Sequence, residues 1–371
     1  MRVVDLELAN FRNYAALRLD PPEGACVVVG ANAQGKSNLL EALALLAVGK
    51  SFRAGRESDM IAIGAPSGSA SARVRTRNGD VQATCVITRA GDGARKRFLR
   101  NGRVVPYARF LGGVAAVTFV PADLQLVSGP ASLRRRFLNT ALSQSLRSYY
   151  RDLAAYAKVL TQKNALLRSG DAGNRMLLAT YNDQLAQLGA HLVCARAAYV
   201  RRLAREAAAA HAKWVGAHDE LEIAYAPNPA QPDEVPAAVA NTLRAALDAA
   251  TKAELARKLS LAGPHRDDIE LSLGSRPLAR FGSQGQQRTA VLALKAAEYA
   301  LARLAAGEAP LLLLDDVFSE LDAQRRNAFF SSIAGFEQAF ITTTDLPDVP
   351  RSFAAEVFEV RAGRVRAVSA A

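Results

Sequence analysis

The sequence predicts a mixed α/β fold in which strands and helices alternate at both ends of the chain and a largely helical segment separates them. Three observations indicate this arrangement: a glycine-rich turn between an apolar run and a helical run at 27–43, a second apolar run that ends in two aspartates at 310–316, and an Ala-, Leu- and Arg-rich stretch at 132–257. We therefore expect one domain made from both chain ends, with a helical insert.

The first part of the chain predicts three strands and a helix. Apolar and acidic residues alternate at 4–8, as in a half-buried strand, and a second strand is expected at 17–19. Residues 26–29 are wholly apolar, which is typical of a buried strand. Leucines recur at helical spacing over 39–46 and predict a helix directly after the glycine-rich turn.

Two Asn-Gly pairs predict hairpins in the next region. Asn78-Gly79 and Asn101-Gly102 each lie between strand-like runs, one of which is 81–88. Asn-Gly is a strong hairpin signal because both central residues of a tight turn then take positive φ. We therefore expect antiparallel strands here.

The segment 132–257 predicts long helices. Breaks are expected at 169–174 and at 226–236, where four prolines indicate a surface loop. The elements expected after this segment are a strand at 269–273, a helix at 286–304, buried strands at 311–314 and 340–343, and a hairpin at 357–368.

Charge, cysteine usage and hydropathy narrow the functional class. Lys and Arg outnumber Asp and Glu by 47 to 35, and this excess favours polyanionic partners such as nucleic acid or an anionic membrane surface, although a basic enzyme would carry the same excess. The three cysteines are far apart in the sequence, which predicts buried thiols in a reducing cytosol rather than disulfides or a zinc site. We expect no secretion signal and no membrane span.

The glycine-rich turn fits the phosphate-loop pattern G-x-x-x-x-G-K-[ST] over residues 30–37. Its glycines let successive N–H groups point at phosphate oxygens, and the helix that follows presents its positive end to the same anion. Lys36 is expected to reach the β- and γ-phosphates, and Ser37 to place its hydroxyl on Mg²⁺. The expected nucleotide contacts are Gly30, Ala31, Asn32, Ala33, Gln34, Gly35, Lys36, Ser37 and Asn38.

A phosphate loop needs a second acid for the metal, and Asp315 and Asp316 follow an apolar strand. Asp315 is expected to hold Mg²⁺ through its water shell, and Asp316 to orient and deprotonate the attacking water, with Lys36 beside the phosphate. An acidic turn at the end of a strand would explain the pair equally well without the phosphate loop. The two motifs are far apart in the sequence, which again indicates an insert between them.

The segment 281–288, FGSQGQQR, opens a predicted helix, with Ser283 placed as its N-cap. Beside the other motifs it resembles the signature sequence of ABC-type ATPases, and 319–322 resembles the D-loop of that superfamily. The resemblance adds nucleotide contacts from Ser283, Gln284, Gly285 and Gln286.

Together with 10–14 and 263–268, the order and spacing of these motifs resemble the RecF family, bacterial DNA-repair ATPases related to SMC proteins. The resemblance implies an ABC-type P-loop ATPase head at 1–131 plus 258–371 and a helical arm domain at 132–257. It implies a homodimer that sandwiches ATP and Mg²⁺, with the signature of one chain meeting the γ-phosphate bound by the other, and with weak hydrolysis. It further implies sequence-independent DNA binding in replication, recombination, repair and the SOS response, and recombinase loading at gaps with RecO and RecR.

Three positions depart from the patterns of related ATPases. Asp316 stands where many ABC proteins carry glutamate, which implies slow turnover. The segment 341–345 has no histidine, so a γ-phosphate sensor there must be a threonine or Asp345. Gln125 is a candidate for the glutamine loop.

Basic residues of the helical segment are the expected DNA contacts, although a solvated helix face or internal packing would also account for them. They are Arg134, Arg135, Arg136, Arg147, Arg151, Lys158, Lys163, Arg201, Arg202 and Arg205. The alternative functions are a metabolic phosphotransferase, which would need no signature element, and a transporter ATPase subunit, which an arginine-rich insert does not favour.

Overall fold

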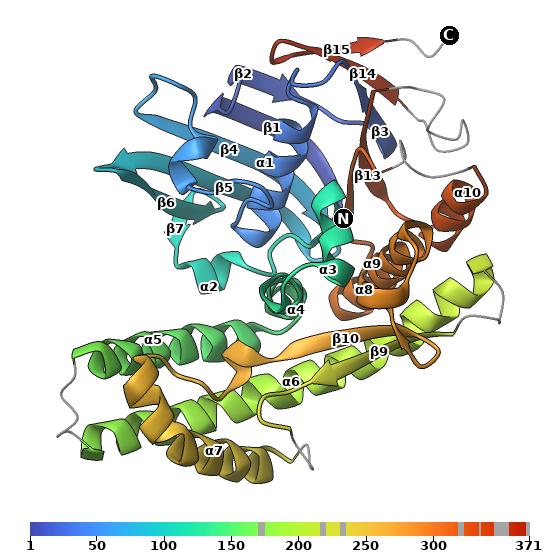
Figure 1. Ribbon diagram of the computed structural model, residues 1–371. Coiled ribbons are helices and arrows are strands. Elements are labelled where there is room, and N and C mark those ends of the chain that lie inside the picture. Colours follow the sequence, from blue (N-terminus) through green and yellow to red (C-terminus); the bar gives the residue numbers. More distant parts are fainter. Residues whose placement is uncertain are drawn as a thin grey trace. The chain divides into compact units, whose positions relative to one another are not determined.

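The computed structural model describes residues 1–169, 175–215, 220–230, 235–317, 323–333, 335–344 and 356–368. The chain forms two compact units: unit 1 comprises 1–123 with 295–371, and unit 2 comprises 124–294. Strands from the two ends of the chain, drawn blue and red in Figure 1, lie side by side in unit 1. The predicted functional domain limits at 131/132 and 257/258 stay a prediction.

A six-stranded antiparallel sheet forms the N-terminal part of unit 1, in the order β2-β1-β4-β5-β6-β7. The alternation at 4–8 buries Leu6 and Leu8 and leaves Glu7 exposed, as predicted. The strands of this sheet are β1 (Arg2–Phe11), β2 (Tyr14–Leu19), β4 (Ser67–Thr76), β5 (Gly79–Ala90), β6 (Gly93–Arg100) and β7 (Arg103–Val105).

Both predicted hairpins are present, but only one has the expected turn. Asn101 (φ 52°) and Gly102 (φ 74°) both adopt positive φ between β6 and β7, as predicted. Between β4 and β5, Thr76 pairs with Gly79, so the turn residues are Arg77 and Asn78, and neither has positive φ. The register of this turn was predicted wrongly because the ladder extends one residue further than the Asn-Gly pair suggests.

A second six-stranded sheet has the order β15-β14-β3-β13-β12-β8 and is parallel except for β15. Helix α1 (Lys36–Val48), rich in Leu and Ala, is buried along most of its length and packs against strands of both sheets. The strands of this sheet are β3 (Gly24–Val29), β8 (Ala116–Phe119), β12 (Leu311–Asp315), β13 (Gln338–Thr343), β14 (Glu356–Arg361) and β15 (Arg364–Val368).

Unit 2 combines long helices with a three-stranded sheet of order β11-β10-β9. Strand β9 lies inside the stretch expected to be helical, so that prediction was wrong at 221–226. Its side chains alternate between buried and exposed, and it pairs with β10, more than forty residues further along the chain. Pairing with a strand that is distant in the sequence overrides the helical preference indicated by the local composition.

Unit 2 includes α4 (Ala131–Ser145), α5 (Arg147–Ser169), α6 (Arg175–Val215), β9 (Leu221–Ala226), α7 (Pro236–Arg257), β10 (Asp268–Leu273) and β11 (Arg276–Pro277). The remaining helices are α2 (Tyr107–Phe110), α3 (Gln125–Ser128), α8 (Leu278–Phe281), α9 (Gln284–Ala306) and α10 (Ala323–Ser332). The three cysteines are free. Among the helices that the structure describes, none has the length and apolar character of a membrane span.

Candidate nucleotide site

Three adjacent parallel strands bring the phosphate loop and the carboxylates to one edge of the second sheet. In the register of these strands, Val29 of β3 lies opposite Thr343 of β13, and Asp315 of β12 lies opposite Thr342. The phosphate loop follows β3, so it and Asp315 lie on either side of β13. Ligands of α/β sheets bind at such carboxyl ends of strands.

The two glycines of the phosphate loop are required by close packing. A Cβ atom at Gly30 would lie 2.5 Å from the carbonyl oxygen of Val360, and one at Gly35 would lie 2.7 Å from Nδ2 of Asn13. Gly35 also has φ 122°, a backbone conformation that residues with a side chain rarely adopt. The pattern recognised in the sequence is therefore a steric requirement of this fold.

Lys36 lies inside the loop and is 6% exposed. Its Nζ donates to the carbonyl oxygens of Gly30 (2.7 Å) and Ala31 (3.1 Å). Burial lowers the pKa of Lys36, and the negative charges of Asp316 and Asp315 oppose that shift. The predicted lysine and both predicted carboxylates therefore share one electrostatic environment.

Two turns far away in the sequence hold the phosphate loop. Asn13 Nδ2 donates to the carbonyl oxygen of Gln34 (2.8 Å), and Gly363 N–H donates to the same oxygen (3.1 Å). The side chain of Gln34 accepts a hydrogen bond from the N–H of Ala362 (2.7 Å). The side chain of Gln34 thus holds the turn between β14 and β15, a role that the sequence did not indicate.

The neighbouring strand holds the carboxylate of Asp315 and the backbone of Asp316. Thr342 Oγ1 donates to Oδ1 of Asp315 (2.7 Å), and the N–H of Asp316 donates to Thr342 Oγ1 (3.0 Å). Within the described residues, neither Oδ2 of Asp315 nor the hydroxyl of Ser37 makes a hydrogen bond, so both oxygens are suited to a hard cation. Among the described residues, no cluster of three or more His, Cys, Asp or Glu could hold a metal ion.

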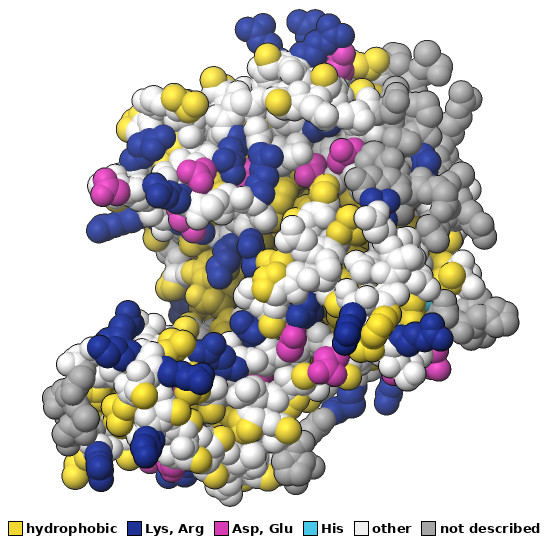
Figure 2. Space-filling view, in the orientation of Figure 1, with side chains coloured by type: hydrophobic (Ala, Val, Ile, Leu, Met, Phe, Trp, Pro, Cys, Tyr) yellow, Lys and Arg dark blue, Asp and Glu magenta, His cyan; other side chains and the backbone are white. Residues whose placement is uncertain are grey.

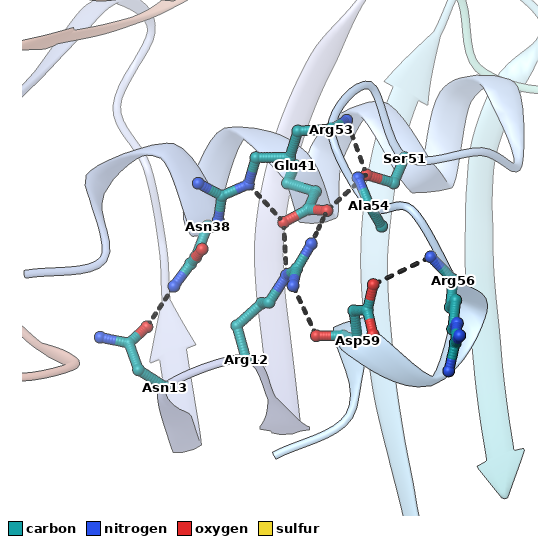
Figure 3. A network of polar contacts seen from close by, with 9 residues as sticks. All are labelled: Arg12, Asn13, Asn38, Glu41, Ser51, Arg53, Ala54, Arg56 and Asp59. Carbon is teal, nitrogen blue, oxygen red and sulfur yellow. Dashed lines mark hydrogen bonds and ion pairs between the residues drawn. The ribbon is translucent and has the colours of Figure 1, made fainter. Parts of the chain in front are cut away.

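A cleft of about 720 Å³ lies beside the start of α1, and its lining includes Arg12, Asn13, Asn38, Arg53 and Asp59. Figure 3 shows Arg12 and Arg53 held by the carboxylate of Glu41. Asn13 and Asn38 share a hydrogen bond of 2.6 Å in this lining, and Asn13 also donates to the carbonyl oxygen of Gln34 in the phosphate loop. The cleft therefore shares Asn13 with the contacts that hold the phosphate loop.

Glu41 is fully buried and accepts hydrogen bonds from Arg12 (2.7 and 2.8 Å), from Arg53 (3.0 Å) and from Ser51. Burial alone would raise the pKa of Glu41, but the hydrogen bonds from Arg12 and Ser51 and the two guanidinium charges outweigh it and lower the pKa. An ionised Glu41 thus fixes two arginines at the cleft. The one signal in the sequence was a glutamate inside an otherwise apolar helix.

The signature segment begins α9 in the way that the sequence indicated. Ser283 Oγ accepts from the N–H of Gln286 (3.2 Å), and Gln286 Oε1 accepts from the N–H of Ser283 (2.9 Å), which is a capping box. Ser283 and Gln284 are exposed, and Gly285 is half-buried. The predicted N-cap is confirmed.

Other predicted residues stand as follows. Gln125 is exposed at the start of α3. The D-loop segment 319–322 and Asp345 lie outside the described residues.

Three basic residues predicted to contact DNA are used inside unit 2. Arg134 binds both carboxylate oxygens of Asp268 (2.6 and 2.8 Å), and Arg135 donates to the carbonyl oxygen of Asp267 (2.7 Å). Lys163 is 1% exposed and forms a 2.7 Å ion pair with a glutamate of α7. The prediction was wrong for the buried Lys163, and it stays a prediction for Arg134 and Arg135, which are half-buried. The others are exposed; they are Arg136, Arg147, Arg151, Lys158, Arg201, Arg202 and Arg205. Figure 2 shows that Lys and Arg side chains lie over the helices of unit 2.

Comparison with known proteins identifies the family. The chain matches the RecF/RecN/SMC N terminal domain over residues 2–362. It is 42% identical to the DNA replication and repair protein RecF of Symbiobacterium thermophilum over 98% of both chains. It is 36% identical to the RecF of Lactobacillus delbrueckii subsp. bulgaricus over 96% of this chain and 95% of the relative.

Solved structures agree. The structure of the recombination mediator protein RecF-ATP in the RecFOR pathway aligns with a TM-score of 0.91 at 30% identity, over 99% of this chain and 97% of that chain. An SMC head bound to the C-winged helix domain of ScpA aligns with a TM-score of 0.55 at 15% identity, over 99% and 98% of the two chains, and shares the fold. The predicted ABC-type head with a helical insert is thus confirmed, and the chain belongs to the RecF family of SMC-related, ABC-type ATPases.

Proposed function

We propose that this chain is an ATP-dependent DNA-binding protein of recombinational repair and replication-fork maintenance, which dimerises around ATP, hydrolyses it slowly and helps load recombinase at gaps. The observation that carries the proposal is the convergence of Lys36, Ser37, Asp315 and Asp316 on one sheet edge, in a chain of the RecF family. We infer that it works in the cytoplasm with RecR- and RecO-like partners, because a close structural relative is described in the RecFOR pathway.

The nucleotide would occupy the phosphate loop and the adjoining cleft. The triphosphate lies against the N–H groups of residues 30–37, with Lys36 at its β- and γ-phosphates. The cleft, at about 720 Å³, is within the usual size of small-molecule pockets and receives the ribose and base. Arg12 and Arg53, fixed by Glu41, add positive charge along its wall.

Hydrolysis would be performed by the two aspartates. Ser37 and Asp315 would hold Mg²⁺, which would supply charge neutralisation on the phosphates. Asp316 orients the attacking water and accepts its proton. Because the aspartate side chain is short, a water bridge or a closer approach is needed, and turnover is slow.

Dimerisation would place the exposed Ser283–Gly285 edge of one chain on the γ-phosphate bound by the other. ATP is then shared by both subunits, so ATP and DNA each favour the closed dimer and strengthen each other's binding.

Helix α5 offers a surface for the DNA backbone. Arg147, Arg151, Lys158 and Arg168 are all exposed, and their spacing places them along one side of the helix. At a rise of about 1.5 Å per residue this stripe is roughly 31 Å long, close to one turn of duplex DNA. The side chains suit phosphate oxygens and give no base readout.

Light scattering with and without ATP and Mg²⁺ tests the proposal. We expect a monomer without nucleotide, a dimer with ATP, and a more stable dimer when duplex DNA is added. Lys36→Met abolishes the ATP-dependent dimer, whereas Lys252→Met, an exposed change on α7, leaves it intact. A chain that remains monomeric with ATP, Mg²⁺ and duplex contradicts the proposal, and indifference to DNA with turnover of a small phosphate acceptor supports a phosphotransferase.

A second variant tests the arrangement between subunits. Ser283→Arg leaves ATP binding by the monomer unchanged and blocks dimerisation, because the bulky charge occupies the surface that meets the partner's nucleotide. Normal dimerisation of Ser283→Arg refutes this arrangement.

A further inference from the structure

One hydroxyl group, that of Thr342, contacts both catalytic aspartates: the carboxylate of Asp315 and the backbone N–H of Asp316. Thr342 lies on β13 between the phosphate-loop strand and the aspartate strand, and it is fully buried. Its Oγ1 lies 2.7 Å from Oδ1 of Asp315 and 3.0 Å from the backbone nitrogen of Asp316. The carbonyl oxygen of Thr342 accepts from that same N–H at 3.1 Å.

The chemistry of these groups fixes the direction of each hydrogen bond. A hydroxyl has one proton, and an ionised carboxylate can only accept, so Thr342 gives its proton to Asp315. The N–H of Asp316 can only donate, so it points at the lone pairs of Thr342 Oγ1 and at its carbonyl oxygen. The hydroxyl group and the carbonyl oxygen of Thr342 are therefore both used in hydrogen bonds with Asp315 and Asp316.

Both aspartates depend on this arrangement. With Oδ1 of Asp315 held by Thr342, the side chain has one orientation, in which Oδ2 makes no hydrogen bond within the described residues. Asp316 has φ 49°, a left-handed conformation that residues with a side chain adopt infrequently. The hydroxyl oxygen and the carbonyl oxygen of Thr342 hold Asp316 in this conformation. The conformation in turn sets the direction in which the side chain of Asp316 leaves the backbone.

We propose that Thr342 is a positioning residue for ATP hydrolysis, whose hydroxyl orients the metal-binding oxygen of Asp315 and fixes the backbone of Asp316. The inference rests on the proposed function of this site. It also bears on the missing histidine: since its hydroxyl is committed to the aspartates, Thr342 is not the γ-phosphate sensor of this strand.

Thr342→Val tests the hydroxyl, because valine matches threonine in shape and removes the hydrogen bonds. Partners behind a metal ligand typically account for about 10- to 100-fold in metal affinity or activity, so we expect losses of that size in the Mg²⁺-dependent part of ATP affinity and in kcat. ATP affinity measured in EDTA stays unchanged, since the phosphate loop is not altered. Thr118→Val, on β8 of the same sheet, is the matched control and changes neither quantity.

Thr342→Ser and Thr342→Cys keep the test decisive if the valine variant does not fold. The two side chains are similar in size, but the thiol is a weak donor and acceptor. We expect the serine variant to retain the Mg²⁺ dependence of ATP binding and the cysteine variant to lose it. Equal Mg²⁺ dependence in the two variants, or wild-type behaviour of a folded Thr342→Val, overturns the inference. A wild-type chain that does not hydrolyse ATP would instead overturn the proposed function.

Discussion

The substitution Arg196→Met should strongly destabilise unit 2, because Arg196 on α6 is the centre of a buried polar network. The side chain is 2% exposed. It donates to the hydroxyl of Tyr149 (3.0 Å), the carbonyl oxygen of Pro264 (2.6 Å), Oδ2 of Asp267 (2.6 Å) and Oδ1 of Asn139 (3.0 Å). These contacts tie three segments of unit 2 to one guanidinium group.

Unit 2 should lose stability because removing Arg196 leaves the buried carboxylate of Asp267 without its positively charged partner. Asp267 is fully buried, and among the described residues its carboxylate keeps the hydroxyl of Tyr225 and the N–H of Asn228 when Arg196 is removed. Breaking a buried ion pair in this way is unfavourable by about 3–5 kcal/mol. For a domain of this size, 1 kcal/mol shifts Tm by about 2–4 °C, so the Tm of unit 2 should fall by roughly 6–20 °C.

Thermal unfolding of the full chain, followed by circular dichroism or calorimetry, measures this shift. Arg202→Met, an exposed arginine on the same helix, is the matched control and should leave Tm unchanged. The double variant Arg196→Met with Asp267→Leu should recover much of the loss, because no buried charge then remains without a partner. A Tm for Arg196→Met within about 1 °C of wild type would show that the network does not stabilise unit 2.

Three further outcomes are expected. Asp316→Asn should keep ATP binding and dimerisation but reduce phosphate release by about 100-fold or more, and full activity would remove Asp316 from catalysis. Replacing Arg147, Arg151 and Lys158 by Gln should lower the slope of log affinity against log salt for duplex DNA by about 2.7, and an unchanged slope would place the DNA elsewhere. Burial lowers the pKa of His265 to about 4, below its usual 6.5, so the unfolded chain binds the extra proton and stability should fall as pH drops from 6.5 towards 4. The free energy of unfolding of His265→Gln, measured with denaturant at several pH values, should depend less on pH than that of the wild type.

The sequence predicted those parts of the fold that depend on neighbouring residues. The phosphate loop was recognised from the spacing of its own residues, and the apolar runs at 26–29 and 311–314 each form a buried strand. Strand β9 escaped prediction because its hydrogen-bond partners lie on β10, in a different part of the sequence.

The candidate site was predicted only in its motifs. The buried Glu41 and its two arginines come from three separate segments, and no local pattern pairs them. Thr342 has an ordinary place in an apolar strand, and only the register of β12 and β13 brings its hydroxyl to Asp315. Among the arginines, composition could not separate those that face solvent from Arg134 and Arg135, which donate to the carboxylate of Asp268 and to the carbonyl oxygen of Asp267.

The hydrogen bonds from Ala362 and Gly363 to Gln34 have a consequence for synthesis on the ribosome. Residues 24–48 leave the ribosome early, yet the strands that flank β3 are made only after all of unit 2. A sheet whose neighbouring strands are distant in the sequence forms late in synthesis. Unit 2 can therefore complete its own contacts before Ala362 and Gly363 are made and bind Gln34 of the phosphate loop. A nascent chain stalled before residue 356 should therefore contain a folded unit 2 and should not retain ATP.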